Sequence, residues 1–549
     1  MSVNSGETVT VREGTPADRA SWRVSPGAVI AVATVVAFGV RLFTLTRPGF
    51  LTQPTEYDDG VYLGGAIRLT QGVLPYKDFA FVQPPGILLL MTPAALFARA
   101  TSTVAGLALV RVLTLLASTA CVALAGRLVR HRGTLVTMLT CFILAIYPPD
   151  IASAHTLLLE PWMNLLCLLG ATAAFRDGRL AIRPARLAWA GIAIGFACTV
   201  KFWSGVPALV LLVLLLADRP AQTWRRRLVA YVAGLAGGFV VPLLPFLVTG
   251  PGTFLRSTIV YQAARVGTYT PMSLRLAHIT GLGDVLGYAG NLTLGTDSNS
   301  LFAQSVVADT APATTHWLPF LAFAILVAVV VAGYLMLRDR TPLDWFALAV
   351  AALALIAILS YSAFFYHYPA FPAPWLAIMA GIAVGGIMRR LHVPIYQIVA
   401  GGIATIIAGA AILQLTQVAQ LKLPAGADEF ASRIPPGACV VTDEISLTVS
   451  ANRFESAKPG CPVVLDALAT TLVFTHGVSV QGGAARDARA VADWQALLSK
   501  ADYVWLSPNV WRRLPWHDGY APAWFYQHFT QIWPAQGWVR GLGNLYERR

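Results

Sequence analysis

The feature that constrains this chain most is a succession of apolar segments with the length and composition of membrane helices. A bilayer crossing needs about 20 apolar residues at a rise of about 1.5 Å per residue. The first segment, Gly27–Leu45, contains one charge, Arg41. Of the 549 residues, 56% are hydrophobic and only 12% are charged, and the mean hydropathy is +0.62. A soluble protein carries far more charge on its surface, so the sequence predicts an all-α polytopic membrane protein.

Further apolar segments follow the first and are separated by short polar loops. They are Gly86–Phe97, Val104–Ala125, Thr134–Tyr147, Leu157–Phe175, Leu187–Val200, Val206–Ala217, Val229–Val248, Trp317–Leu337, Trp345–Leu359, Phe371–Ile387 and Val393–Leu415. Basic residues gather in the loops Arg127–Arg132, Arg176–Arg186, Arg219–Arg227, Arg338–Arg340 and Arg389–His392. Since Lys and Arg concentrate in cytoplasmic loops, the net charge of +13 indicates membrane topology and not a nucleic-acid partner.

The segment Gly86–Phe97 decides the topology. If every segment crosses and the N-terminus is inside, all five basic loops fall outside; if Gly86–Phe97 does not cross, all five fall inside. This segment has twelve residues, follows Pro84-Pro85 and contains Pro93, so it is short for a crossing. We expect a re-entrant or interfacial helix, eleven crossings, a cytoplasmic tail over residues 1–25 and an extracytoplasmic C-terminus. A full crossing compensated elsewhere stays open, which gives a range of about 11–13 transmembrane helices.

Ionisable residues concentrate on the side of the membrane that this topology places outside. Glu56, Asp58 and Asp59 lie within four positions in the external loop 46–85. Like charges this close repel unless a metal, a proton or a cation joins them, although a solvated loop is the other interpretation. Glu160 lies near the start of the apolar segment Leu157–Phe175, and Lys201 directly follows Leu187–Val200. Ionisable groups at such positions usually line a cavity. A lysine at a helix end also reaches the interface by snorkelling.

Five motifs in this order resemble the GT-C glycosyltransferases, membrane enzymes that use polyprenyl-phosphate sugars and include protein O-mannosyltransferases and lipid A aminoarabinose transferases. The motifs are Asp58-Asp59-Gly60-Val61-Tyr62, the loop from Gly72 to Gly86 with Gln83-Pro84-Pro85, Leu159-Glu160-Pro161, Lys201 after a Gly- and Ala-rich helix, and Tyr366-His367-Tyr368-Pro369. The resemblance covers about residues 26–418. This sequence has His367 where many relatives have Arg, and Gln83 where the aminoarabinose transferases have Lys.

The resemblance implies transfer of a hexosyl or pentosyl group from a polyprenyl-phosphate donor to a glycan, lipid or protein acceptor, with inversion, on the extracytoplasmic face of the cell membrane. A carboxylate must take the proton of the acceptor hydroxyl, and cations or a divalent metal must hold the leaving phosphate. The expected catalytic residues are Asp58, Asp59 and Glu160. The expected donor-phosphate ligands are Lys201, Arg265 and His367, and the expected substrate contacts are Tyr62, Lys77, Asp78 and Tyr368. Asp59 and Glu160 could hold Mg²⁺ or Mn²⁺ through oxygen ligands.

Residues 424–549 have the composition of a soluble domain. Ala438–Asp443, Pro462–Asp466 and Ala501–Leu506 have the pattern of short buried strands, and Asp493–Lys500 that of a helix, which predicts a small α/β or α+β domain. An oxidising compartment favours a disulfide between its two cysteines, Cys439 and Cys461. The other four, Cys121, Cys141, Cys167 and Cys198, lie in apolar segments and are expected to pack there as small hydrophobic residues.

Two other functions remain open. One is a non-catalytic transporter or assembly protein for cell-envelope lipids, which is expected to show internal repeats with broken helices near mid-membrane; the sequence shows no such symmetry. The other is a polymerase or ligase of lipid-linked glycans, which would share the site but use a longer donor.

Overall fold

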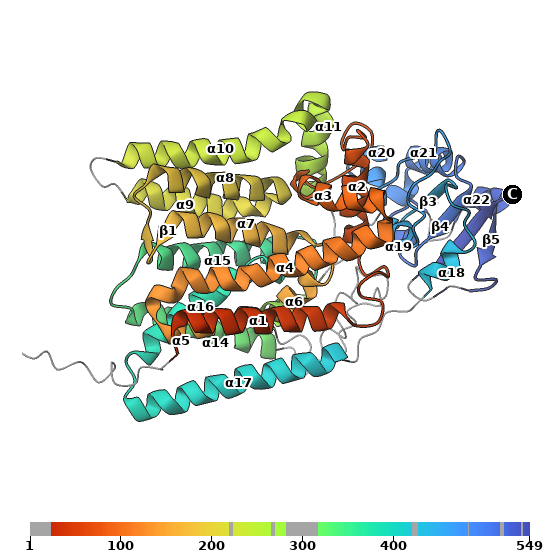
Figure 1. Cartoon of the computed structure of the whole chain (residues 1–549). Helices are drawn as coiled ribbons and strands as arrows, with labels where there is room; N and C mark the ends of the chain where they lie inside the picture. The colour runs from red at the N-terminus through yellow and green to blue at the C-terminus, as the bar shows by residue number, and fades with distance from the viewer. Residues whose placement is uncertain are drawn as a thin grey trace, which may run out of the picture.

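The structure, a computed structural model, describes residues 24–218, 223–264, 270–281, 317–419, 426–480, 482–516, 521–537, 539 and 542–549. Long helices form a bundle, and a small domain with a sheet lies at one end of it (Figure 1). The bundle contains α1 (Pro26–Leu45), α2 (Tyr57–Thr70), α3 (Gly86–Ala100), α4 (Thr103–Val129), α5 (Thr134–Ile146), α6 (Pro148–Ala154), α7 (Leu159–Ala174), β1 (Phe175–Arg176), β2 (Arg179–Leu180), α8 (Pro184–Val200), α9 (Gly205–Ala217), α10 (Trp224–Thr249), α11 (Pro251–Leu255), α12 (Tyr261–Ala264), α13 (Met272–Thr280), α14 (Leu318–Met336), α15 (Pro342–Ser360), α16 (Ala373–Met388) and α17 (Val393–Ala419).

The small domain follows α17. It contains α18 (Ala427–Ala431), β3 (Val440–Thr442), α19 (Ile445–Ser450), α20 (Ala467–Phe474), α21 (Ala488–Leu498), β4 (Tyr503–Leu506), α22 (Ala523–His528), β5 (Phe529–Trp533) and β6 (Asn544–Arg548). The sequence predicts the two domains at residues 26–418 and 424–549. The boundary between them falls at residues 420–425, which lie outside the described part of the chain, so it stays a prediction.

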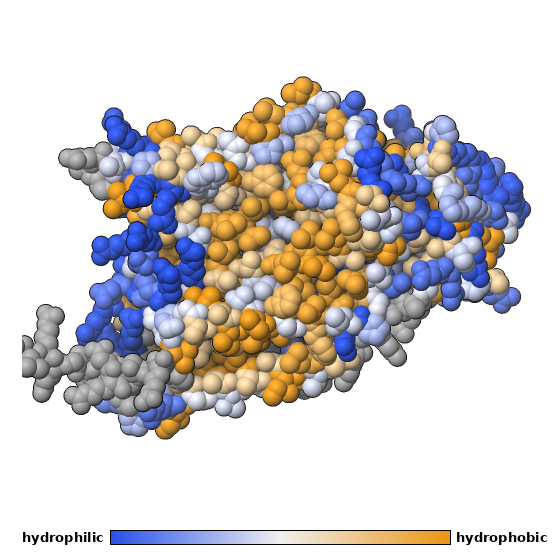
Figure 2. Space-filling model, in the orientation of Figure 1, coloured by the Kyte–Doolittle hydropathy of each residue, from blue (hydrophilic) through white to orange (hydrophobic). Residues whose placement is uncertain are grey.

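The bundle has the composition of a multi-pass membrane domain. Six helices in the described residues are long and apolar enough to cross a bilayer, and the α5–α6 pair, bent by 55°, makes up to seven. Figure 2 shows an apolar belt between two hydrophilic ends. The predicted eleven crossings include shorter helices such as α8 and α16, so that number stays a prediction. The path of the predicted re-entrant segment Gly86–Phe97 also stays a prediction; it lies in α3, which has 15 residues.

The charge inside the first apolar segment is paired. Arg41 forms a buried ion pair with Asp150, and its Nε donates to Ser118 Oγ at 2.7 Å. Ser118 in turn donates to Asp150 at 2.9 Å. A charge in hydrocarbon is tolerated when a partner and hydrogen bonds satisfy it, so Arg41 joins α1 to α4 and α6 without facing lipid.

The loop 46–85, which the sequence predicts to be external, contains a helix, α2, that packs between the bundle and the small domain (Figure 1). A Cβ atom placed on Gly60 would lie 2.3 Å from the backbone nitrogen of Ser446 in α19, so only glycine permits this contact. Tyr57 Oη donates to Asp466 Oδ1 at 2.7 Å. The small domain therefore rests directly on the helix that carries the predicted acidic residues.

The small domain has a mixed sheet in the order β3-β4-β6-β5, in which β3 and β4 are parallel and the other pairs antiparallel. The predicted strands at Ala438–Asp443 and Ala501–Leu506 and the helix at Asp493–Lys500 are confirmed as β3, β4 and α21. The predicted strand Pro462–Asp466 is wrong, because these residues form no strand pairing. Its buried Leu465 packs in the apolar cluster with Val61 of α2, so tertiary contact and not a sheet explains its hydrophobicity.

The cysteine predictions are confirmed. Cys439 and Cys461 form a disulfide with a Cα–Cα distance of 5.6 Å. Cys121, Cys141, Cys167 and Cys198 are free and buried.

We predict that labelling of cysteines introduced at exposed positions will place residues near Ala427 and Ala289 outside the membrane and residues near Gln222 and Asp339 inside. Ala289 and Gln222 lie outside the described residues, whereas Ala427 opens α18 of the small domain and Asp339 lies in a basic loop. The reason is the positive-inside rule. The assay compares a membrane-impermeant maleimide before and after permeabilisation, and labelling of residue 222 in intact cells contradicts the arrangement.

We predict that replacing both disulfide cysteines, Cys439→Ser with Cys461→Ser, destabilises the small domain by about 3 kcal/mol, because the closed loop restricts the unfolded chain. The disulfide spans 22 residues. Proteolysis rates of the full-length protein report the change. Equal rates for the double variant and the parent contradict the prediction.

Candidate functional site

The three carboxylates at the start of α2 each have a different partner. Glu56 is the N-cap residue of α2, and its Oε2 accepts a hydrogen bond from Tyr366 at 3.2 Å. Asp58 accepts from Tyr62 Oη at 3.1 Å. Asp59 forms an ion pair with Arg111. These partners lie on different elements, and the positive end of the helix dipole favours both first-turn aspartates.

Asp59 is the centre of a buried network. Its Oδ2 accepts from Arg111 Nη2 at 2.5 Å, from Thr156 at 2.8 Å and from Thr55 at 3.1 Å. The Asp59 and Arg111 side chains are both 0% exposed, and Arg111 Nη1 also donates to the Phe50 carbonyl at 2.9 Å. A fully buried carboxylate that is already paired with an arginine and two hydroxyl groups is poorly placed to reach a substrate hydroxyl. These contacts favour a structural role for Asp59.

A second cluster joins three residues that are far apart in the sequence. Glu160 lies in the first turn of α7 and is fully buried. Its Oε1 accepts from Lys201 Nζ at 2.7 Å, and His367 Nδ1 lies 3.0 Å from its Oε2. The structure therefore brings together the predicted residues Glu160, Lys201 and His367.

Lys201 is positioned by the turn that contains Pro84-Pro85-Gly86. A Cβ atom on Gly86 would lie 2.3 Å from Thr199 Oγ1 and 2.6 Å from the Thr199 carbonyl carbon, so the start of α3 packs against the end of α8. Lys201 directly follows α8 as its C-cap. Its Nζ lies 3.9 Å from the centre of the Trp203 ring and 4.5 Å from that of Tyr368, a cation–π geometry.

A cavity of about 220 Å³ opens beside this lysine. It is lined by Gln83, Pro84, Lys201, Phe202, Trp203, Thr258, Ile259, Gln262, Ala263, Tyr361 and Tyr368. Aromatic and aliphatic side chains make up most of its wall, and Lys201 supplies a positive charge. A cavity of this kind can receive an anionic group that is attached to an apolar chain.

Tyr62 is a buried residue of α2 that is influenced by the charges of both Asp58 and Glu160. Burial raises its pKa well above the usual range, and the negative charges of Asp58 and Glu160 raise it further. Its helix α2 lies outside the candidate membrane spans. Tyr62 is therefore a neutral phenol that donates to Asp58.

Two other predicted residues lie apart from these clusters. Lys77 and Asp78 are exposed, and Asp78 accepts from the Leu74 backbone nitrogen at 2.8 Å, which closes the turn before α3. In the described part of the chain, no hydrogen bond or ion pair joins either side chain to Asp58, Glu160 or Lys201. Arg265 lies outside the described residues.

Arg111 is a central residue that the sequence reasoning missed. It lies inside the apolar segment Val104–Ala125, and the rule that drew attention to Glu160, an ionisable group in an apolar segment, applies to it equally. Arg41, the one charge in the segment Gly27–Leu45, follows the same rule.

The two predicted metal ligands, Asp59 and Glu160, do not form a metal centre. Asp59 and Glu160 are each neutralised by their own cations. Among the described residues, no group of three or more His, Cys, Asp or Glu side chains is arranged to hold a metal. The pair therefore does not fit Mg²⁺ or Mn²⁺, and we derive no step through a metal.

Comparisons with solved structures identify the fold. ArnT from Cupriavidus metallidurans bound to undecaprenyl phosphate is 15% identical, with a TM-score of 0.54 over 94% of this chain and 97% of that one. The oligosaccharyltransferase from Archaeoglobus fulgidus tethered with an acceptor peptide is also 15% identical, with a TM-score of 0.52 over 94% of this chain and 74% of that one. No protein-family model and no curated protein matches the sequence. The chain thus has the GT-C fold that its motifs predicted.

We predict that Asp59→Asn lowers stability by about 3 kcal/mol or more, because it leaves Arg111 as an uncompensated buried charge. Thermal unfolding in detergent, followed by tryptophan fluorescence, measures the change. Asp58→Asn is the matched control, since Asp58 is only half-buried and should change the melting temperature little. A melting temperature equal to the parent's in Asp59→Asn contradicts the structural role.

Proposed function

We propose that the chain is a membrane glycosyltransferase that moves a sugar from a polyprenyl-phosphate donor to a cell-envelope acceptor. The observation that carries the proposal is the convergence of Glu160, Lys201 and His367 beside a largely apolar cavity, next to an acidic helix start. Such a site meets both needs of the reaction: cations for a lipid-borne phosphate and a carboxylate for the acceptor proton.

Asp58 is the proposed base. It is half-buried and receives a hydrogen bond from Tyr62, whereas Asp59 is fixed by Arg111, Thr55 and Thr156. As the acceptor hydroxyl attacks the anomeric carbon, its proton passes to the Asp58 carboxylate, the new glycosidic bond forms, and the bond from that carbon to the phosphate oxygen breaks. A single displacement of this kind inverts the anomeric centre.

Lys201 and His367 are the proposed ligands of the leaving phosphate. An ammonium group has three donors, and Glu160 accepts from Lys201, so the remaining donors are available to an anion in the adjoining cavity. The Trp203 and Tyr368 rings restrict the lysine to this position. Glu160 is a positioning residue in this mechanism, since it contacts both the Lys201 and the His367 side chains. Preorganised charge of this kind stabilises a leaving group without further reorganisation.

The fold supports the class of donor. ArnT was solved with undecaprenyl phosphate, and the archaeal oligosaccharyltransferase AglB with an inhibitory peptide and a dolichol-phosphate. A glycan, a lipid or a protein remains the proposed kind of acceptor. The Cys439–Cys461 disulfide is typical of an oxidising compartment, which supports catalysis on the extracytoplasmic face with the N-terminus in the cytoplasm.

We predict that Asp58→Asn lowers turnover by about 10²–10⁴-fold, the usual range for a lost general base, while donor binding survives. Lys201→Ala should weaken donor binding strongly and lose turnover with it. The assay incubates purified protein with a panel of radiolabelled polyprenyl-phosphate sugars, and measures transfer together with thermal protection by the donor.

Two exposed residues of the small domain provide matched controls: Asp428→Asn and Lys500→Ala remove the same groups far from the proposed chemistry. Both should retain parental turnover and donor binding. Full activity in Asp58→Asn contradicts the base, and unchanged donor binding in Lys201→Ala contradicts the phosphate site. If no donor in the panel is bound or turned over by the parent, a transporter or assembly protein becomes the better account.

A further inference from the structure

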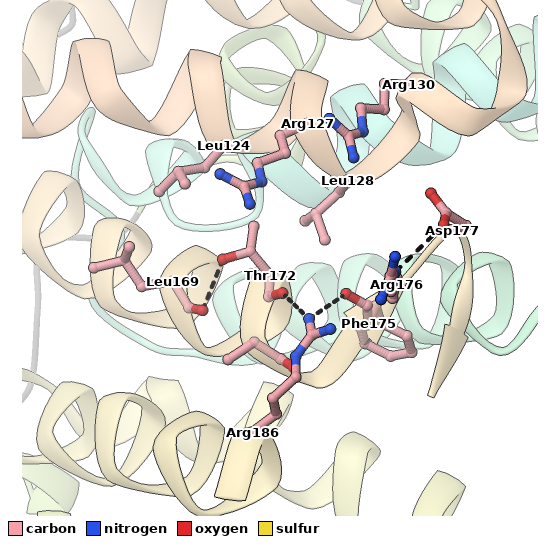
Figure 3. Close-up of a pocket in the computed structure, with 11 residues that line it drawn as sticks. Leu124, Arg127, Leu128, Arg130, Leu169, Thr172, Phe175, Arg176, Asp177 and Arg186 are labelled. Carbon is pink, nitrogen blue, oxygen red and sulfur yellow. Dashed lines mark hydrogen bonds and ion pairs between the residues drawn. The ribbon is translucent and has the colours of Figure 1, made fainter. Parts of the chain in front are cut away.

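A second cavity lies at the opposite end of the bundle from the small domain, where α4 and α7 end and α8 begins. Its volume is about 560 Å³, within the usual range of about 300–1,000 Å³ for ligand sites. Figure 3 shows arginines from three elements around it: Arg127 of α4, Arg176 of β1 and Arg186 of α8, with Arg130 just beyond the end of α4.

The cavity carries excess positive charge. In the described part of the chain, no carboxylate pairs with Arg127, Arg130 or Arg186, and the remaining Arg176 faces Asp177 at 3.8 Å in an exposed pair. Four arginines and one aspartate line the cavity, a balance of +3. Basic cavities between transmembrane helices near the cytoplasmic side are suited to lipid headgroups that carry phosphate.

Arg186 is fixed in place by the end of α7. Its Nε donates to the Ala173 carbonyl at 2.9 Å, and its Nη2 donates to the carbonyls of Thr172 at 2.9 Å and Phe175 at 3.1 Å. These carbonyls belong to the helix end, where the dipole is negative. Among the described residues, Nη1 has no hydrogen-bond partner, so a preorganised guanidinium keeps donors available in the cavity wall (Figure 3).

The cavity also has an apolar wall that continues onto the outer surface of the bundle. Leu169 of α7 lines the cavity, and its side chain is 41% exposed on the surface of the bundle. Leu124 and Phe175 add further apolar surface. A rim of arginines beside exposed aliphatic surface matches a molecule with an anionic head and a hydrocarbon chain.

We propose that this cavity binds the phosphate headgroup of an anionic membrane lipid, with Arg127, Arg130 and Arg186 around the phosphate and the acyl chains along Leu169. The positive-inside rule explains exposed basic loops, but it requires neither a cavity nor an arginine locked against a helix end. This cavity shares no lining residue with the one proposed for the sugar donor, so each proposal can be tested independently of the other.

The test compares two double variants of the full-length protein in a neutral detergent. Arg127→Gln with Arg130→Gln removes two arginines from the cavity and leaves Arg186 in place. Arg179→Gln with Arg183→Gln removes two exposed arginines from the same end of the bundle that do not line the cavity. Native mass spectrometry and thermal unfolding measure the binding of phosphatidylglycerol, phosphatidylcholine and inorganic phosphate.

Phosphatidylglycerol should bind and stabilise the parent and the Arg179/Arg183 variant, and phosphatidylcholine should not. In the Arg127/Arg130 variant the affinity should fall by about 30-fold, since each arginine near an anionic headgroup contributes about 1 kcal/mol. An equal loss of phosphatidylglycerol affinity in the two variants would show that the lipid binds diffuse surface charge, which overturns the proposal. Thermal protection by inorganic phosphate without protection by phosphatidylglycerol would show that the cavity binds a soluble anion, and this result also overturns the proposal of a lipid ligand.

Discussion

The buried ion pair between Asp59 and Arg111 is the interaction on which the site depends. With Thr55 and Thr156 it fixes the first turn of α2 against α4 and the connection before α7. Successive residues of an α-helix point about 100° apart, so locking Asp59 inward directs Asp58 to a different face. Breaking a buried pair costs several kcal/mol, and this stability holds the neighbouring carboxylate in one orientation. The two adjacent aspartates therefore have different surroundings, and the proposed division of roles between them rests on this difference.

A second set of contacts joins this helix start to the cluster of Glu160, Lys201 and His367. Glu56 accepts from Tyr366, the residue before His367, and His367 and Lys201 both meet Glu160. The charges of Asp58 and Glu160 both raise the pKa of Tyr62, in addition to the effect of burial. The small domain adds Tyr57–Asp466 and the close contact at Gly60 from the other side. The proposed base and the proposed phosphate ligands are therefore parts of one connected structure, which favours the fixed geometry that preorganised catalysis requires.

The sequence predicted the class of fold because apolar segments and loop charges report the membrane directly, and it predicted β3, β4, α21 and the disulfide from local pattern. It singled out Glu160 and Lys201 through the high cost of ionisable groups in apolar segments. Asp58 and Asp59 stood out through their clustered charges, and His367 through the resemblance to the GT-C glycosyltransferases. It did not predict their partners. Arg111 lies 52 positions from Asp59, and no local pattern encodes that pairing. For the same reason Leu465 resembled a strand residue, since burial against α2 and burial in a sheet leave the same hydrophobic signature.

The most direct test of the division between Asp58 and Asp59 is the pH dependence of sugar transfer in the parent, Asp58→Asn and Asp59→Asn proteins, measured per folded molecule. A general base that must be ionised makes kcat/KM fall about tenfold per pH unit on the acid side of its pKa. If Asp58 is the base, kcat/KM of the parent falls in this way at low pH, and so does that of the folded Asp59→Asn protein. The residual activity of Asp58→Asn should not show this fall. A fall that persists in Asp58→Asn and disappears in Asp59→Asn would contradict the proposed roles.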